Sequence, residues 1–333
     1  MDSIISVISK VNSVLNDIVW GWPVIILILG TGILLSIRTR FLQLSHFGDS
    51  LNETIKPTVK ELGNKEKKKD RMKSVSQFEA FSAAISGTVG TGNIIGVTAA
   101  ILTGGPGAVF WMWVCAFFGM VTNYSENVLG LYYRERDEEG NLSGGAFYYI
   151  RNGLKCKVLA YLAAIFCLLG AIGMSAVQTN KITDTFSTTL APLFAARNLI
   201  WVRLAIGVVV AVLLAIIIIG GIKRIGKVAS RLVPLMSLFF IVLSLVSIFA
   251  HAARIPSVFG MIFGNAFNFK AAGSGIFGYA FSQVVKKGMA RGVFSNEAGM
   301  GSSVIAHSAS ETREPVIQGL WGVFEVFFDT FVV

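Results

Sequence analysis

Long runs of apolar residues restrict the folds open to this chain more than any other feature of its sequence. A helix needs about 20 mostly apolar residues to cross a bilayer. The runs that we expect to enter the membrane are eight in number, at residues 19–37, 75–102, 108–131, 158–179, 199–219, 232–250, 271–285 and 316–333. Only 14% of the residues are charged, against about a quarter in a soluble domain. We therefore predict an all-α integral membrane protein.

The basic residues follow the side of the membrane on which each loop is expected to lie. Taken alternately, the loops at 38–73, 132–157, 223–231 and 286–315 hold 23 of the 29 Lys and Arg residues. Because cytoplasmic loops are enriched in these residues, we expect a multi-pass plasma-membrane protein with its N-terminus outside. The net charge of +10 is then a topology signal and predicts no nucleic-acid partner. Residues 1–17 repeat apolar side chains at helical spacing, which predicts an amphipathic helix on the membrane surface.

Residue types that usually mark enzymes or metal sites are scattered along the chain. The three cysteines are Cys115, Cys156 and Cys167, and the three histidines, His46, His251 and His307, fall in or beside expected loops. Neither group has the spacing of a metal site or a disulfide framework. The sequence also lacks the H-E-x-x-H and G-x-S-x-G motifs. We expect no enzyme activity, no cofactor and no metal site built from these residues.

The segment at 81–96, F-S-A-A-I-S-G-T-V-G-T-G-N-I-I-G, begins as a membrane helix and then loses helical character. Four glycines fall within ten residues, and each costs a helix interior about 1 kcal/mol relative to alanine. Inside a bilayer, broken backbone is tolerated only where protein buries it or where it lines a cavity. A helix broken near the midplane is typical of the binding site of secondary transporters. A helix-packing motif at Gly92-x-x-x-Gly96 is the alternative.

A second glycine-rich stretch opens the segment that starts at residue 271. Gly273, Ser274 and Gly275 stand in it, and this segment runs opposite to the one at 75–102. Two broken helices of opposite direction predict an inverted five-helix repeat with the substrate between them. The alternative is a simple loop that enters an ordinary helix.

The first break supplies groups of both polarities. The amides of Thr91, Gly92 and Asn93 would open a half-helix whose positive end suits a carboxylate. Carbonyls near Ser86 and Val89, at the end of the preceding half-helix, suit a hard cation such as sodium. Gln178 is polar inside an apolar run, so it is either a third substrate contact or a helix-to-helix hydrogen bond.

Acidic residues in membrane segments are further candidates. Glu79 and Glu126 lie near the cytoplasmic ends of their segments, where we expect solvation or a pair with a loop arginine. Glu325 and Asp329 are four residues apart and therefore share one helix face, which we expect to turn away from lipid unless the helices that cover it are missing.

Several motifs of this chain resemble the alanine or glycine:cation symporter family, which comprises the sodium:alanine symporters. The matching stretches are G-G-P-G-A-V-F-W-M-W at 104–113, G-T-G-N at 90–93, V-Q-T-N at 177–180, A-R-G-V-F-S-N-E-A-G-M-G-S at 290–302, and Q-G-L at 318–320 followed by F-E-V-F-F-D at 324–329. The resemblance covers the chain from about residue 75 to its end. It implies a leucine-transporter-like inverted-repeat fold with one extra N-terminal helix. It also implies sodium-coupled uptake of alanine or glycine, with Thr91, Gly92, Asn93 and Gln178 on the substrate and carbonyls near Ser86 and Val89 facing sodium.

Two parts follow from this comparison. Residues 1–74 form the amphipathic segment, the extra helix and a basic cytoplasmic loop. Residues 75–333 form the transporter core, with a first repeat at 75–250 and an incomplete second repeat at 271–333. We expect the second repeat to be truncated, so that Glu325 and Asp329 face lipid and the chain does not transport alone. The alternatives are a proton-coupled or other-substrate carrier of this fold, and a non-transporting fragment or sensor.

Overall fold

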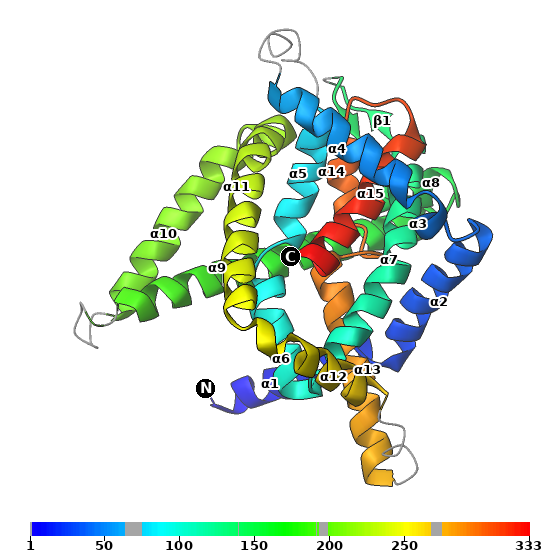
Figure 1. Cartoon of the computed structure of the whole chain (residues 1–333). Helices are drawn as coiled ribbons and strands as arrows, with labels where there is room; N and C mark the ends of the chain where they lie inside the picture. Colours follow the sequence, from blue (N-terminus) through cyan, green and yellow to red (C-terminus); the bar gives the residue numbers. More distant parts are fainter. Residues whose placement is uncertain (1, 64–74, 139, 191, 193–198, 268–274) are drawn as a thin grey trace.

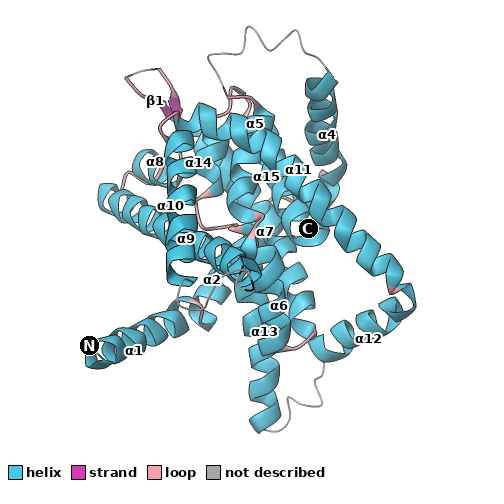
Figure 2. Ribbon diagram, turned by 90° about the vertical axis from the view of Figure 1, so that its left-hand side faces the viewer, coloured by secondary structure: helices cyan, strands magenta, loops and turns pink. Residues whose placement is uncertain are grey.

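The structure is a computed structural model that describes the chain apart from residues 1, 64–74, 139, 191, 193–198 and 268–274 (Figure 1). Its described part is helical except for one short antiparallel hairpin, in which β1 (Glu135–Arg136) pairs with β2 (Leu142–Ser143) (Figure 2). The helices of the first half are α1 (Asp2–Val19), α2 (Trp22–Arg38), α3 (Leu42–Ser45), α4 (Phe47–Gly63), α5 (Gln77–Thr88), η2 (Gly92–Gly96), α6 (Val97–Gly104), α7 (Gly107–Tyr132) and α8 (Ala146–Asn152). Those of the second half are α9 (Lys157–Leu190), α10 (Leu199–Ile218), α11 (Gly221–Ala250), η5 (Ala252–Arg254), α12 (Ile255–Ala266), α13 (Gly275–Asn296), α14 (Ser303–Ser308), α15 (Pro315–Phe327) and η7 (Phe328–Val332). The predicted all-α class is confirmed.

Membrane-spanning length and apolar character are found at six of the eight expected segments. Five described helices are long and apolar enough to cross a bilayer, or six if the bent pair of Gln77–Thr88 and Gly92–Gly104 is one span. The segment at 19–37 forms a shorter apolar helix, Trp22–Arg38, and the one at 271–285 does not meet the same test over its described residues. Three boundaries differ from the sequence prediction. The expected loop at 251–270 contains α12, α9 continues to Leu190, and α13 continues to Asn296. Lys286, Lys287 and Arg291 interrupt the apolar run of α13, but its small residues keep the helix packed on α7.

Helix α7 is the centre of the packing, because α13, α15, α2, α12 and α14 all lie against it. Close approach of α13 depends on two glycines one turn apart. A Cβ at Gly288 would lie 2.4 Å from the Ala108 carbonyl oxygen, and one at Gly292 would lie 2.8 Å from the Cys115 Cβ. Small residues at this spacing bring membrane helices into backbone contact. The turn before α7 is equally tight, since a Cβ at Gly107 would lie 2.6 Å from the Ala266 nitrogen.

A second core joins α5, α11 and α15. Phe81 and Ile85 of α5 pack with Val233 of α11 and Trp321 of α15, and all four side chains are buried. The start of α5 is fixed by a reciprocal cap, in which Ser76 Oγ accepts from the Glu79 amide and the Ser76 amide donates to the Glu79 carboxylate. Glu79 is therefore a half-buried capping residue, a role that the sequence prediction did not name.

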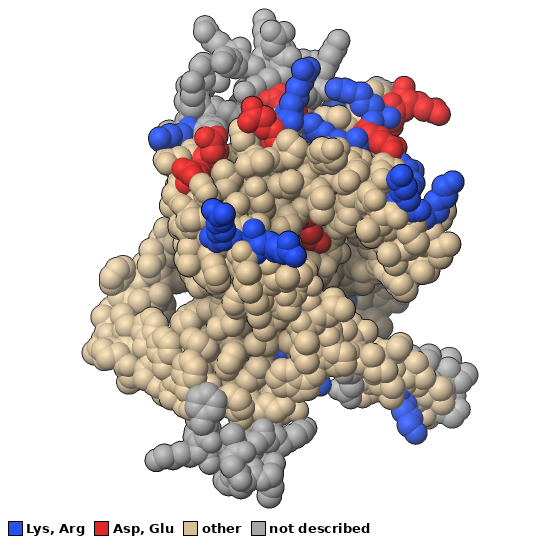
Figure 3. All heavy atoms as spheres, turned by 90° about the vertical axis from the view of Figure 1, so that its right-hand side faces the viewer, with Lys and Arg blue, Asp and Glu red and all other residues tan. Residues whose placement is uncertain are grey.

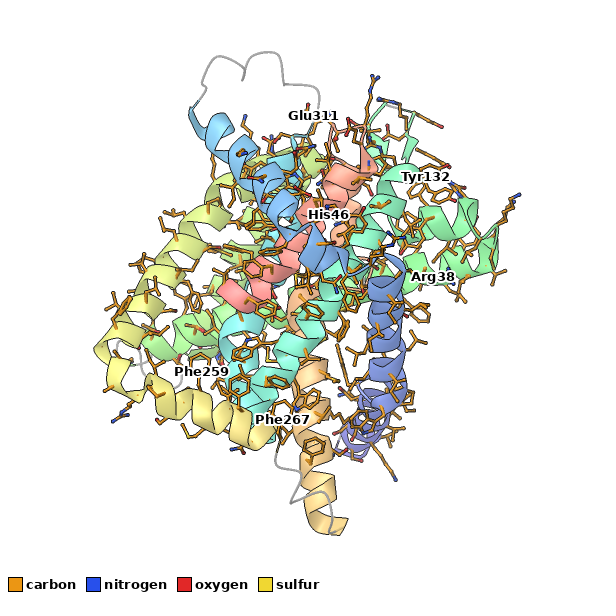
Figure 4. The ribbon with its side chains drawn as sticks, turned by 45° about the vertical axis from the view of Figure 1, so that its right-hand side comes forward. Arg38, His46, Tyr132, Phe259, Phe267 and Glu311 are labelled. Atoms are coloured by element: carbon orange, nitrogen blue, oxygen red, sulfur yellow. The ribbon has the colours of Figure 1, made fainter. Side chains whose placement is uncertain are left out.

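The two ends of the molecule differ in charge. Lys, Arg, Asp and Glu side chains gather at the end that carries the β1–β2 hairpin, and an uncharged belt lies below them (Figure 3). Tyr132 and Glu311 lie toward this end, whereas Phe259 and Phe267 lie at the opposite end (Figure 4). The outward side chains of α9, α10 and α11 are largely apolar, as a lipid-facing surface requires. Which end is cytoplasmic, and the bounds of the two repeats, stay predictions.

Candidate functional site

The interruption predicted near residue 90 is present, and it bends the segment by 42°. Helix α5 ends at Thr88, and Val89 is extended, with φ −77° and ψ 106°. The chain then enters η2, a π-helical turn over Gly92–Gly96. Asn93 Oδ1 accepts a hydrogen bond from the Gly90 amide at 2.9 Å. The side chain of Asn93 therefore satisfies a backbone group that the broken helix leaves free.

Three elements that are distant in the sequence meet at Asn93. Its Nδ2 donates to Asp329 Oδ1 of η7 at 2.8 Å and lies 3.3 Å from Ser295 Oγ of α13. Ser295 Oγ in turn donates to Asp329 Oδ2 at 2.9 Å, and Thr330 Oγ1 donates to the same oxygen at 3.0 Å. Asn93, Ser295 and Asp329 are all buried. We call these three residues the break cluster.

Among the described residues, the carboxylate of the break cluster has hydroxyl and amide partners but no basic one. Asp329 is 1% exposed, and the described residues give it no ion pair within 4.0 Å. A buried carboxylate without a counter-ion is costly. The site therefore suits a cation that would neutralise it.

The other residues predicted for the first break lie around this cluster. Gly92 faces α13, where an added Cβ would lie 3.9 Å from both the Phe294 ring and the Ser295 Cα. Thr91 is the half-buried residue before η2. Gln178 reaches the break from α9, because its Nε2 lies 3.5 Å from the Gly87 carbonyl oxygen and its Oε1 lies 3.1 Å from a Cβ placed on Gly90.

The residues predicted for sodium contribute their side chains elsewhere. Ser86 donates its hydroxyl to the Ala83 carbonyl of its own helix at 2.6 Å, and Val89 is buried in the core with Phe81. Their roles as carbonyl ligands therefore stay a prediction about the backbone alone.

The predicted second break lies partly outside the described residues. Gly273 and Ser274 are not described, and Gly275 is the first residue of α13. The structure interrupts this membrane segment further along, at 297–302 between α13 and α14. There Glu297 has φ 53°, and Gly299 and Gly301 have φ 86° and 76°, values that L-residues with side chains rarely adopt. This stretch has the mixture of polar residues and glycines that marked the first break, and that signal was available in the sequence.

Two acidic expectations are corrected. Glu325 and Asp329 do not face lipid: they are 0% and 1% exposed, because Glu325 of α15 contacts α7 and α14, and Asp329 of η7 contacts α13. The Glu126 carboxylate accepts a hydrogen bond from the Gly299 amide at 3.0 Å, and the described residues give it no arginine partner within 4.0 Å. His307, expected in or beside a loop, lies buried on α14 with its Nε2 2.9 Å from Glu325 Oε2.

Outside the membrane segments, Glu135 of the hairpin is paired with Arg151 of α8. Arg151 Nη2 lies 2.6 Å from Glu135 Oε2, and this guanidinium holds the pKa of the Glu135 carboxyl below its usual value. Both side chains are largely exposed, so the pair contributes little to stability.

The family model described as "Sodium:alanine symporter family" matches residues 5–333. The chain belongs to the sodium:alanine symporter family. This is a family of transporters, so the chain is not an enzyme, and the predicted resemblance is confirmed. Its membership of this family and its apolar helices together indicate that the chain is a multi-pass membrane protein.

Curated relatives agree along nearly the whole chain. It is 40% identical to the sodium/alanine symporter AgcS of Methanococcus maripaludis over 98% of its length, covering 68% of that protein. It is 38% identical to the transporter YflA of Bacillus subtilis over 96% of its length, covering 64% of that protein. The probable sodium/glutamine symporter GlnT of Bacillus subtilis is 34% identical over 98% of the chain. The chain thus spans about two thirds of the length of these family members.

Proposed function

We propose that this protein takes part in the sodium-coupled symport of a small neutral amino acid, alanine or glycine, into the cell by alternating access. The observation that carries this function is the break cluster, which joins the first broken helix to α13 and η7 through a buried carboxylate. Binding sites of secondary transporters lie at such broken helices. The name of AgcS, a sodium/alanine symporter, supports the same substrate class.

The substrate is a zwitterion, and the break offers groups for its carboxylate. The amides of Thr91, Gly92 and Asn93 stand at the start of the second half-helix, whose positive end favours an anion. Gln178 contributes a side-chain amide from α9, beside the Gly87 carbonyl. Gly92 leaves room at this point, since the nearest atoms to an added Cβ, on the Phe294 ring and Ser295, lie 3.9 Å away. These contacts favour a substrate with a small side chain.

Sodium is proposed to bind beside the substrate at the break cluster. Hard cations prefer carboxylate, hydroxyl and carbonyl oxygens. Asp329 and Ser295 provide the first two kinds, and carbonyls near Ser86 and Val89 provide the third. Sodium would neutralise the Asp329 carboxylate and tie η7 to the broken helix, so that its binding organises the substrate site. We extend this proposal to the inverted-repeat, leucine-transporter-like arrangement, with the N-terminus outside.

An Asp329→Asn substitution separates this function from its competitors. Sodium should raise the alanine affinity of the purified wild-type chain. We expect this increase to be at least tenfold smaller in Asp329→Asn, because the side chain that would bind the cation then carries no charge. Asp49→Asn is the matched control, since Asp49 is an exposed aspartate on α4 that faces His46. Unchanged sodium stimulation in Asp329→Asn would contradict the sodium site, and stimulation by protons in place of sodium would indicate a proton-coupled carrier.

A further inference from the structure

A carboxylate and an imidazole form a fully buried pair away from the break cluster. Glu325 on α15 and His307 on α14 are each 0% exposed, and Glu325 Oε2 lies 2.9 Å from His307 Nε2. Neither residue contributes to the proposed amino-acid and sodium contacts. Ionisable side chains are expensive inside a membrane protein and are retained there for function.

Hydrogen bonds surround this pair on both sides. Glu325 accepts from Asn123 Nδ2 at 3.0 Å and from Ser303 Oγ at 2.7 Å. On the other side of the ring, His307 Nδ1 lies 2.5 Å from Gln318 Nε2. With the Gln318 amide in this orientation, its nitrogen donates and Nδ1 accepts, which matches a neutral imidazole that carries its hydrogen on Nε2.

The same residues can also satisfy a protonated imidazole. Reversal of the Gln318 amide would place its oxygen against Nδ1, which would then donate. The Gln318 nitrogen would face Ser310 Oγ, which now donates to the Gln318 oxygen at 3.0 Å and would become the acceptor. Gain of one proton at His307 therefore needs a turn of one amide and leaves these contacts satisfied.

Other ionisable groups lie around this pair. Glu325 interacts electrostatically with three further carboxyl groups, Glu126 on α7, Glu297 before α14 and Asp329. The other packed elements contribute ionisable groups that are already engaged or exposed: Glu79 of α5 in its cap, and Asp49 and Glu53 of α4 and His46 just before it at exposed positions. The described basic side chain beside this region is Arg134, whose guanidinium donates to the carbonyls of Ser308, Ser310 and Thr312.

We propose that the His307–Glu325 pair is a proton-binding site of this protein, with His307 Nδ1 as the atom that receives the proton. Imidazole is the side chain whose charge ordinarily changes between about pH 5 and pH 8. The site connects to the charged end of the molecule, because Ser310 pairs with Val75 before α5 and lies beside Arg134. With the proton bound, an ion pair joins α14 to α15, one turn from Asp329. Binding of the proton thereby holds α14, the helix that follows the 297–302 break, against α15.

Histidine nitrogen NMR on the full 333-residue chain in detergent tests this site. The chain has three histidines, and His46→Gln and His251→Gln assign the two exposed ones, leaving His307 by elimination. We expect His307 to show the neutral Nε2–H form at about pH 8 and the doubly protonated form at about pH 5. In Glu325→Gln, which keeps the shape of the side chain and removes its charge, His307 should stay neutral over this range.

Two outcomes would overturn the assignment. One is a His307 signal that keeps a single form from about pH 5 to pH 8, and the other is the same titration in Glu325→Gln as in the wild type. A measurement on the wild type tests the site even if the Glu325→Gln variant does not fold. In the wild type, the side-chain amide nitrogen of Gln318 should shift with the same midpoint as His307, and an amide signal that ignores pH contradicts the site.

Discussion

At the scale of single residues, Asn93 decides the geometry of the break. Its oxygen accepts from the Gly90 amide before the half-helix, and its nitrogen donates to Asp329 behind it. One side chain therefore fixes both the local turn and a contact between segments 236 residues apart in the chain. Replacement of a buried hydrogen-bonding group leaves its partners unsatisfied, at about 1–3 kcal/mol.

Asn93→Ala is predicted to lower amino-acid affinity about ten- to hundredfold, which follows from about 1–3 kcal/mol lost at the break. Equilibrium binding of labelled alanine to the purified variant measures this. Thr98→Ala is the matched control, because Thr98 is an exposed residue of the same segment whose hydroxyl donates to the Ile94 carbonyl of its own helix. Equal affinity in both variants would mean that Asn93 only caps the helix.

The sequence allowed Asn93 and Gln178 to be chosen, since each is a polar residue inside an apolar or broken membrane segment. It gave no indication that Ser295 would complete the break cluster or that His307 would be buried against Glu325. Those contacts join α13, α14 and α15 through tertiary packing, and no local pattern encodes them. The roles of Ser86, Val89, Gly273 and Ser274 stay predictions.

At the scale of elements, close packing of small residues on α7 holds the site together. Helix α13 carries Ser295 to the break cluster, and it reaches α7 through Gly288 and Gly292. The glycines at 87–96 made the first break predictable, because they lower helix propensity locally. The length of α13 was not predictable from hydropathy. Its last turns contain Lys286, Lys287 and Arg291, and the helix continues there because its backbone packs on α7.

Gly288→Ala is predicted to destabilise the folded protein by about 1–3 kcal/mol, because overpacking forces neighbouring backbone apart. A Cβ at this position would lie 2.4 Å from the Ala108 carbonyl oxygen and 2.7 Å from the Trp111 Cβ. Thermal unfolding in detergent should show a lower Tm than for the wild type. Gly170→Ala on α9 is the matched control, since nothing lies within 4 Å of its Cβ position, and it should leave the Tm equal or slightly higher. A Tm for Gly288→Ala no lower than that of the control would show that α13 can move off α7.

At the scale of the whole molecule, charge and hydropathy divide the chain into an apolar belt and two ends. The β1–β2 hairpin and the α10–α11 turn lie at one end, and the α6–α7 turn and α12 lie at the other (Figure 1). This alternation of loops is what the distribution of basic residues predicted. The assignment of the charged end to the cytoplasm rests on the enrichment of Lys and Arg in cytoplasmic loops.

Cysteine labelling tests this topology in intact cells. In a chain with Cys115, Cys156 and Cys167 replaced by alanine, Glu138→Cys in the hairpin should react with a membrane-impermeant maleimide only after the cells are opened. Ala253→Cys, at the opposite end, should react in intact cells. Both positions are exposed, so a difference between them reports the side of the membrane. Labelling of Glu138→Cys in intact cells would reverse the orientation.

The central claim, that the break in α5 holds an amino acid together with sodium, is tested most directly by alanine binding to the purified chain. Labelled alanine should bind in sodium buffer, weaken at least tenfold when potassium replaces sodium, and be displaced by unlabelled alanine or glycine. Glutamine in the same competition separates a small-residue site from a larger one. Alanine binding of equal strength in sodium and potassium, or no saturable binding in sodium, would contradict the account.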